Sequence, residues 1–149
     1  MPFCHLALRG PRPLNEAYPA SLVTVGDHIR KRRLDLGLFQ RQAAERIGVT
    51  ASTVNNWEKH RSAPGLREWP SVIRFLGYLP FEVDDSPAAL IKAYRLVRGL
   101  SQYELAKQNR VDESTAWRWE SGLSKVPDTL VQKAKAVVDS LVHPDPPVH

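Results

Sequence analysis

An internal repeat limits the fold of this chain more than any other feature of the sequence. Residues 29–58 recur, without a gap, as residues 91–120. The identical pairs are Ile29 and Ile91, Arg33 and Arg95, Leu34 and Leu96, Gly37 and Gly99, Leu38 and Leu100, Gln40 and Gln102, Ala44 and Ala106, Val49 and Val111, Ser52 and Ser114, Thr53 and Thr115, Trp57 and Trp119, and Glu58 and Glu120. These identities far exceed chance. A repeat of this length indicates two copies of one structural unit.

Each copy contains a short amphipathic helix. In the first copy, residues 40–47 are good helix formers, and Ala43, Ala44 and Ile47 form a small apolar face. Gly48 is expected to end this helix, because glycine adopts a positive φ without a steric penalty. The pattern therefore predicts a helix that is buried on one side and followed by a tight turn.

A second short helix follows the turn. Thr50 or Ser52 is expected to cap its start, and Val54 and Trp57 are expected to face inward. Two short helices that cross steeply, with a polar second helix, form a helix-turn-helix. In the second copy the turn lacks its glycine, but Asn109–Arg110 can still close it.

Both copies resemble the Cro/repressor-type helix-turn-helix domain of bacterial and phage transcriptional regulators. The resemblance rests on the motif R-x-x-x-G-L-x-Q, then Ala44 or Ala106, then S-T-x-x-x-W-E, and it extends from Val25 to about Leu141. It implies an all-α protein with two tandem lambda-repressor-like helix-turn-helix units of about four helices each. No sheet is expected.

Periodicity and prolines divide the chain into five segments. Residues 1–22 hold four prolines without a sustained period, so we expect a disordered N-terminal arm, with a DNA- or partner-binding arm as the alternative. Residues 23–77 form the first expected domain and residues 87–142 the second. Residues 78–86 are a linker with apolar residues that should lie against a domain surface, and residues 143–149 are a disordered tail. Each domain is small, so mutual packing is expected.

Several side chains are expected to be structural. In the first helix, Val25, Ile29 and Leu36 should share one inward face. The tryptophans at the equivalent positions 57 and 119 should lie in the two cores. The resemblance also implies two partly buried ion pairs, which join Arg33 to Glu58 and Arg95 to Glu120.

Composition excludes several classes of function. The net charge of +5 and the pI of about 9.6 are compatible with a polyanionic partner. The single cysteine, Cys4, allows no internal disulfide and no cysteine-rich zinc site, and no histidine pair has metal-ligand spacing. No apolar run approaches the length of a membrane span. The N-terminus lacks a basic region followed by an apolar core, so we expect no signal peptide. We expect a cytoplasmic protein without cofactors, and no catalytic constellation indicates an enzyme.

The resemblance implies a DNA-binding surface in the first copy. DNA contacts are expected around the second short helix, from Thr50, Ala51, Ser52, Thr53, Asn55 and Asn56. Asparagine can pair with adenine through two hydrogen bonds. Phosphate contacts are expected from the flanking residues Gln40, Arg41, Lys59 and Arg61.

The second copy matches less well at this surface. Its expected DNA contacts are Gln102, Glu113, Ser114, Trp117 and Arg118. Arg118 can bind guanine, whereas the carboxylates of Asp112 and Glu113 would repel phosphates. Trp117 can contact a base or sugar, or it can belong to an interface. DNA contact therefore stands beside dimerisation and intrachain packing as a role for this copy.

Together these patterns predict a sequence-specific regulator that binds double-stranded DNA, with a second copy of the chain as a candidate partner in a homodimer. An antitoxin, an excisionase or a phage-type accessory DNA-binding factor is the alternative within DNA binding. A protein-interaction module that has lost DNA contact is the alternative from another class. No small-molecule ligand and no membrane partner are expected.

Overall fold

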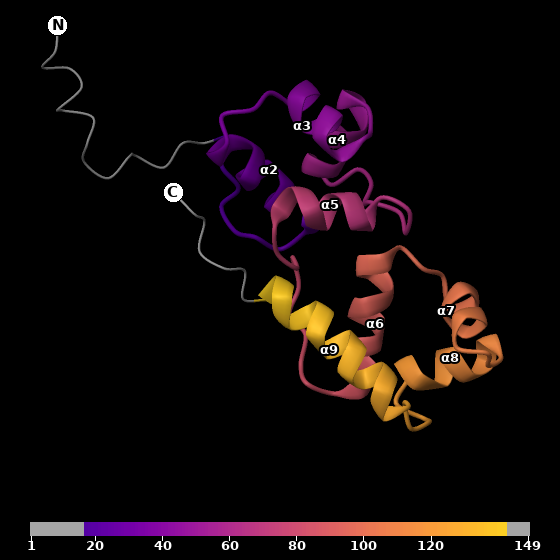
Figure 1. Cartoon of the computed structure of the whole chain (residues 1–149). Helices are drawn as coiled ribbons and strands as arrows, with labels where there is room; N and C mark the ends of the chain where they lie inside the picture. The colour runs from indigo at the N-terminus through magenta and orange to yellow at the C-terminus, as the bar shows by residue number, and fades with distance from the viewer. Residues whose placement is uncertain (1–16, 143–149) are drawn as a thin grey trace, which may run out of the picture.

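A computed structural model of the chain describes residues 17–142. Residues 1–16 and 143–149, with Cys4, the expected tail and most of the expected arm, lie outside that description. Residues 17–142 form eight helices and no strand (Figure 1). The helices are α2 (Val25–Asp35), α3 (Gln40–Ile47), α4 (Ala51–Glu58), α5 (Trp69–Leu76), α6 (Pro87–Arg98), α7 (Gln102–Gln108), α8 (Glu113–Glu120) and α9 (Asp128–Val142). None of these eight helices is long and apolar enough to cross a membrane.

The period of the sequence recurs in the positions of the helices. We refer to α2–α5 as the first unit and to α6–α9 as the second unit. The first three helices of the two units begin at residues that the repeat makes equivalent: Val25 and Pro87, Gln40 and Gln102, and Ala51 and Glu113. An all-α fold is thus confirmed for the described residues, and the expected repeat has the same helix spacing in both halves.

The core of the first unit combines six residues that the sequence placed inward with three residues of α5. Its buried members are Ile29, Ala43, Ala44, Ile47, Val54, Trp57, Val72, Phe75 and Leu76. The prediction for Leu36 was wrong, because this side chain is 38% exposed. Helix α2 ends at Asp35, so Leu36 caps the helix and does not continue its inward face. Gly37 then reverses the chain with a φ of 67°.

The tight turns between the paired helices close differently in the two units. Gly48 has a φ of 91°, and the Thr50 side chain caps α4 by accepting a hydrogen bond from the Thr53 amide at 3.2 Å. In the second unit Arg110 takes the left-handed conformation with a φ of 57°, and Asn109 Nδ2 donates to the Leu105 carbonyl at 2.8 Å. Arginine therefore replaces the missing glycine, as the sequence allowed.

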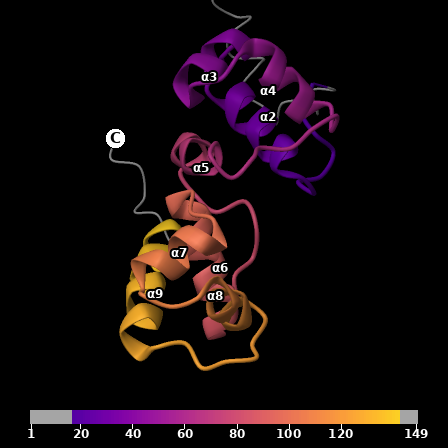
Figure 2. The ribbon, with the colours of Figure 1, turned by 90° about the vertical axis from the view of Figure 1, so that its right-hand side faces the viewer.

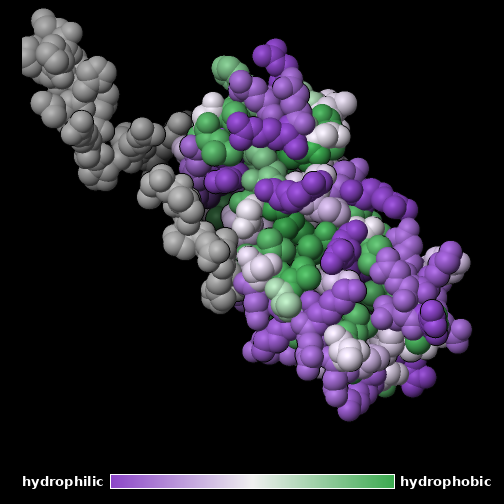
Figure 3. Space-filling model, in the orientation of Figure 1, coloured by the Kyte–Doolittle hydropathy of each residue, from purple (hydrophilic) through white to green (hydrophobic). Residues whose placement is uncertain are grey.

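Helix α5 joins the two units. Its residue Ile73 belongs to the core of the second unit, although Val72 and Phe75 belong to the core of the first. The segment after α5 follows the same surface, with Leu79 only 7% exposed. At Gly99, a Cβ would lie 2.8 Å from the ring of the proline at position 70, so α6 and α5 approach closely. Figures 1 and 2 show α5 between helices α2–α4 and the second unit. Figure 3 shows apolar side chains gathered in the middle of the face that Figure 1 presents.

Candidate nucleic-acid interface

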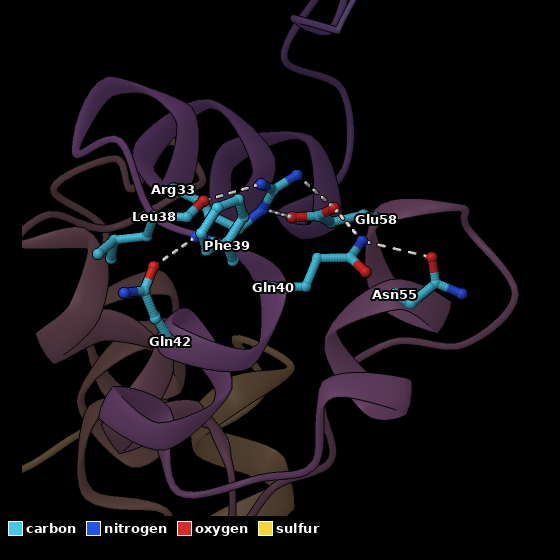
Figure 4. Close-up of polar contacts among 7 residues, drawn as sticks. All are labelled: Arg33, Leu38, Phe39, Gln40, Gln42, Asn55 and Glu58. Carbon is cyan, nitrogen blue, oxygen red and sulfur yellow. Dashed lines mark hydrogen bonds and ion pairs between the residues drawn. The ribbon is translucent and has the colours of Figure 1, made fainter.

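A buried ion pair fixes the end of α4 against α2 (Figure 4). Arg33 Nε donates to Glu58 Oε1 at 2.6 Å, and Arg33 Nη2 donates to Glu58 Oε2 at 3.1 Å. Arg33 Nη1 also donates to the Leu38 carbonyl at 3.0 Å, which fixes the loop before α3. The two charged side chains are only 13% and 4% exposed. The pair expected from the resemblance is therefore confirmed as a buried, bidentate contact, and it joins three segments.

Gln40 extends this network to the surface of α4. Its Nε2 donates to Glu58 Oε2 at 2.8 Å and to Asn55 Oδ1 at 3.3 Å. Both amide hydrogens of Gln40 are thus used within the unit. A phosphate contact at this position would then fall to the backbone N–H of Gln40, which begins α3 and has no partner inside the helix.

The remaining polar side chains of α4 differ in how available they are. The hydroxyls of Thr50 and Thr53 lie 2.8 Å apart and hydrogen-bond to each other. Ser52 is exposed and Ala51 is half-buried at the first turn. Asn56 is half-buried, and its side-chain amide bonds to no other residue within 17–142. Ser52 and Asn56 therefore present the freest hydrogen-bonding groups on this helix.

Exposed cations flank α4. Arg41 at the start of α3 and Lys59 and Arg61 after α4 are all exposed, and none of them has an ion pair within the described residues. The segment after α4 is held by His60, whose Nε2 lies 2.8 Å from Asp27 Oδ1. Burial raises the pKa of Asp27, but hydrogen bonds from the side chain of His60 and from residues 23 and 24 outweigh it, so the net pKa is lowered. An ionised Asp27 thus positions the segment that carries Lys59 and Arg61.

Both units are basic, and the net positive charge is slightly larger in the first. Residues 23–77 contain ten Lys and Arg against five Asp and Glu, whereas residues 87–142 contain nine against six. Within the basic run of α2, Lys31 pairs with Asp35 at 2.7 Å and Arg32 donates to the Phe75 carbonyl at 3.2 Å. These two side chains therefore have structural partners, whereas the cations beside α4 have none within the described residues.

The second unit repeats the contacts among arginine, glutamate and glutamine. It lacks an equivalent of the contact between Gln40 and Asn55. Arg95 Nε pairs with Glu120, and Gln102 Nε2 donates to Glu120 Oε2 at 2.9 Å. Trp117 stands in the place of Asn55, so Gln102 has no amide partner on the outer face of α8. Four of the expected contact residues of this unit are exposed together on α8: Glu113, Ser114, Trp117 and Arg118.

The sequence did not single out two residues of the first unit, the buried Gly26 and the exposed Phe39. At Gly26, a Cβ would lie 1.9 Å from the Trp57 carbonyl oxygen, so α2 and α4 cross at a distance that leaves no room for a side chain. A glycine in the first turn of a helix, where alanine is preferred, was the available signal. Phe39 is 71% exposed beside Gln40, and no periodicity marks it.

Comparisons with known proteins bear on this surface. Residues 29–83 match a family model described as helix-turn-helix. An uncharacterized HTH-type transcriptional regulator of Methanothermobacter thermautotrophicus is 45% identical over 49 residues, which is 33% of this chain and 71% of that protein. No solved structure matches significantly. Within residues 17–142, no group of three or more histidine, cysteine, aspartate or glutamate side chains is arranged to hold a metal ion.

Proposed function

The chain belongs to the helix-turn-helix family, and we propose that it is a transcriptional regulator that reads the major groove of duplex DNA with α4 of its first unit. A major groove about 12 Å wide admits one α-helix, and its base edges are read by short polar side chains. The first unit offers one such helix, with Ser52 and Asn56 available and with Arg41, Lys59 and Arg61 beside it.

One observation carries this proposal: hydrogen bonds from α2 and α3 fix the position of α4, the proposed reading helix. Glu58 at the end of α4 receives hydrogen bonds from Arg33 and Gln40, and Gln40 also bonds to Asn55. A preorganised helix loses little conformational entropy on binding, so more of its contact energy contributes to affinity. The exposed cations then supply the salt-dependent part of binding through the phosphates.

The second unit is proposed to be a second copy of the same helix-turn-helix fold. Support comes from the equivalent starts of the first three helices and from the repeated contact of Arg95 and Gln102 with Glu120. Its outer face is not suited to the same ligand, because acidic residues at positions 112 and 113 replace Thr50 and Ala51. Sequence-specific contacts are therefore assigned to the first unit.

Asn56→Ala should weaken binding to the preferred site by about 1–3 kcal/mol while non-specific binding stays nearly unchanged. The reason is that Asn56 is free to bond to a base edge, and bases differ whereas phosphates do not. Fluorescence anisotropy on a selected duplex and on a scrambled duplex measures both terms. Gln132→Ala, an exposed change on α9, is the control. An equal loss on both duplexes would mean that Asn56 does not read bases.

Lys59→Ala and Arg61→Ala should each lower affinity for every duplex and reduce the slope of log K against log salt by about 0.9 per lost phosphate contact. Both cations are exposed and unpaired within the described residues, so their loss removes charge without disturbing the core. Lys135→Ala on α9 provides the matched control. A slope equal to that of the unmodified chain would place the tested side chain away from the DNA backbone.

A further inference from the structure

The outer face of α7 and α8 carries large apolar side chains where the first unit carries polar or basic ones. Three of them are 58%, 50% and 61% exposed, in the order Tyr103, Trp117 and Leu123. The equivalent residues of the first unit are Arg41, Asn55 and Arg61. The backbone of Leu123 stays at the last turn of α8, because its amide donates to the carbonyl of residue 118 at 2.9 Å. We call this set of two aromatic side chains and one leucine, Tyr103, Trp117 and Leu123, the aromatic face.

DNA is a poor occupant for the aromatic face. The start of α8, where the first unit would meet a duplex, carries the exposed carboxylates of Asp112 and Glu113. Carboxylates at that position repel phosphates, and the two cations and the amide of the first unit have become aromatic or apolar. Exposed tryptophan and tyrosine side chains are instead typical of the centre of protein interfaces.

The exposed charges on α8 are arranged so that two copies of this helix can pair them. Glu113 and Arg118 are both exposed and lie at opposite ends of the outer face of the helix, with Ser114 and Trp117 between them. If two α8 helices pack antiparallel about a two-fold axis between residues 115 and 116, Glu113 of one copy lies opposite Arg118 of the other. The same axis places Ser114 opposite Trp117. A two-fold interface requires this kind of self-complementary surface.

We propose that the aromatic face binds a second copy of this chain, with the α8 helices antiparallel and Glu113 paired with Arg118 across the axis. Figures 1 and 2 show α7 and α8 in the second unit, well apart from α3 and α4, so a dimer formed here leaves both α4 helices free. The pairing does not depend on the DNA-binding function proposed above. Should both hold, one dimer carries two reading helices, as two-fold DNA sites require.

Sedimentation equilibrium of the full chain tests this interface. The unmodified chain should be a dimer that dissociates on dilution, and Trp117→Ala should raise the dimer dissociation constant by at least about tenfold. Glu113→Arg and Arg118→Glu, each alone, should also weaken the dimer, since like charges then meet across the axis. The double variant with both changes should dimerise again, because the pair is restored in the opposite sense.

Two controls separate the interface from other effects. Lys135→Glu, an exposed charge reversal on α9, should leave the dimer unchanged, and thermal unfolding by circular dichroism should be similar for all variants. A chain that stays monomeric at every concentration overturns the proposal, as do single charge reversals that leave the dimer intact. So does a Trp117→Ala variant that keeps its mass but loses affinity for DNA, because that result assigns the aromatic face to nucleic acid.

Discussion

Glu58→Ala is expected to destabilise the first unit by about 3–5 kcal/mol, the range for removing one partner of a buried ion pair. The change leaves the guanidinium of Arg33, which is 13% exposed, without its carboxylate, and it leaves the Gln40 amide without its main acceptor. Small domains have a total stability of about 5–15 kcal/mol, so the loss is a large fraction of the whole. Urea unfolding of the full chain followed by circular dichroism measures it.

The double variant Arg33→Met with Glu58→Leu separates the stranded charge from the lost contact. Apolar side chains of similar size often replace a buried ion pair at little cost, so this variant should recover most of the stability lost in Glu58→Ala. Its affinity for DNA should nevertheless be lower than that of the unmodified chain, because Gln40 no longer has the acceptor that helps to orient α4. A loss below about 1 kcal/mol in Glu58→Ala would contradict the structural role assigned to the pair.

Gly26→Ala should cost about 3 kcal/mol, at the upper end of the usual range for overpacking. The added methyl would lie 1.9 Å from the carbonyl oxygen of Trp57, which is backbone and cannot rotate away. Helices α2 and α4 must therefore separate, and the buried side chains between them lose contacts. Thermal unfolding of the full chain should reveal the loss as a lower midpoint for the first unit.

Ala88→Gly is the matched control for that substitution. Residue 88 is equivalent to residue 26 in the repeat, and the second unit already accommodates an alanine there. Removing that methyl should cost only about 1 kcal/mol, which is the helix propensity of glycine against alanine. Equal effects of the two changes would mean that the crossing of α2 and α4 imposes no special restriction at residue 26.

The sequence predicted the helices because their signals are local. Apolar periodicity identified Ile29, Ala43 and Val54 as buried, and Gly48 marked the turn, since each signal depends on neighbours along the chain. The repeat strengthened these assignments, because most of the features occurred twice. The predicted burial of Leu36 was wrong for a related reason, because periodicity alone does not mark the residue at which a helix ends.

The details of the site depend on contacts between distant segments, which periodicity does not encode. Asn55 and Asn56 look alike in the sequence, yet Gln40, on another helix, engages only Asn55. The close crossing of α2 and α4 and the contact of Asp27 with His60 likewise join segments that lie far apart in the sequence. The structure thus ranks candidates that the sequence treats as equal.

Selection of bound sequences from a pool of random duplex DNA tests the central claim most directly. If α4 of the first unit reads the major groove, the unmodified chain should enrich a common motif. Asn56→Ala should enrich a motif that has lost information at one base step while the neighbouring positions are retained. Failure of the unmodified chain to enrich any motif would contradict the assignment of α4 as the reading helix. So would an identical motif from the unmodified chain and from a variant that carries both Ser52→Ala and Asn56→Ala.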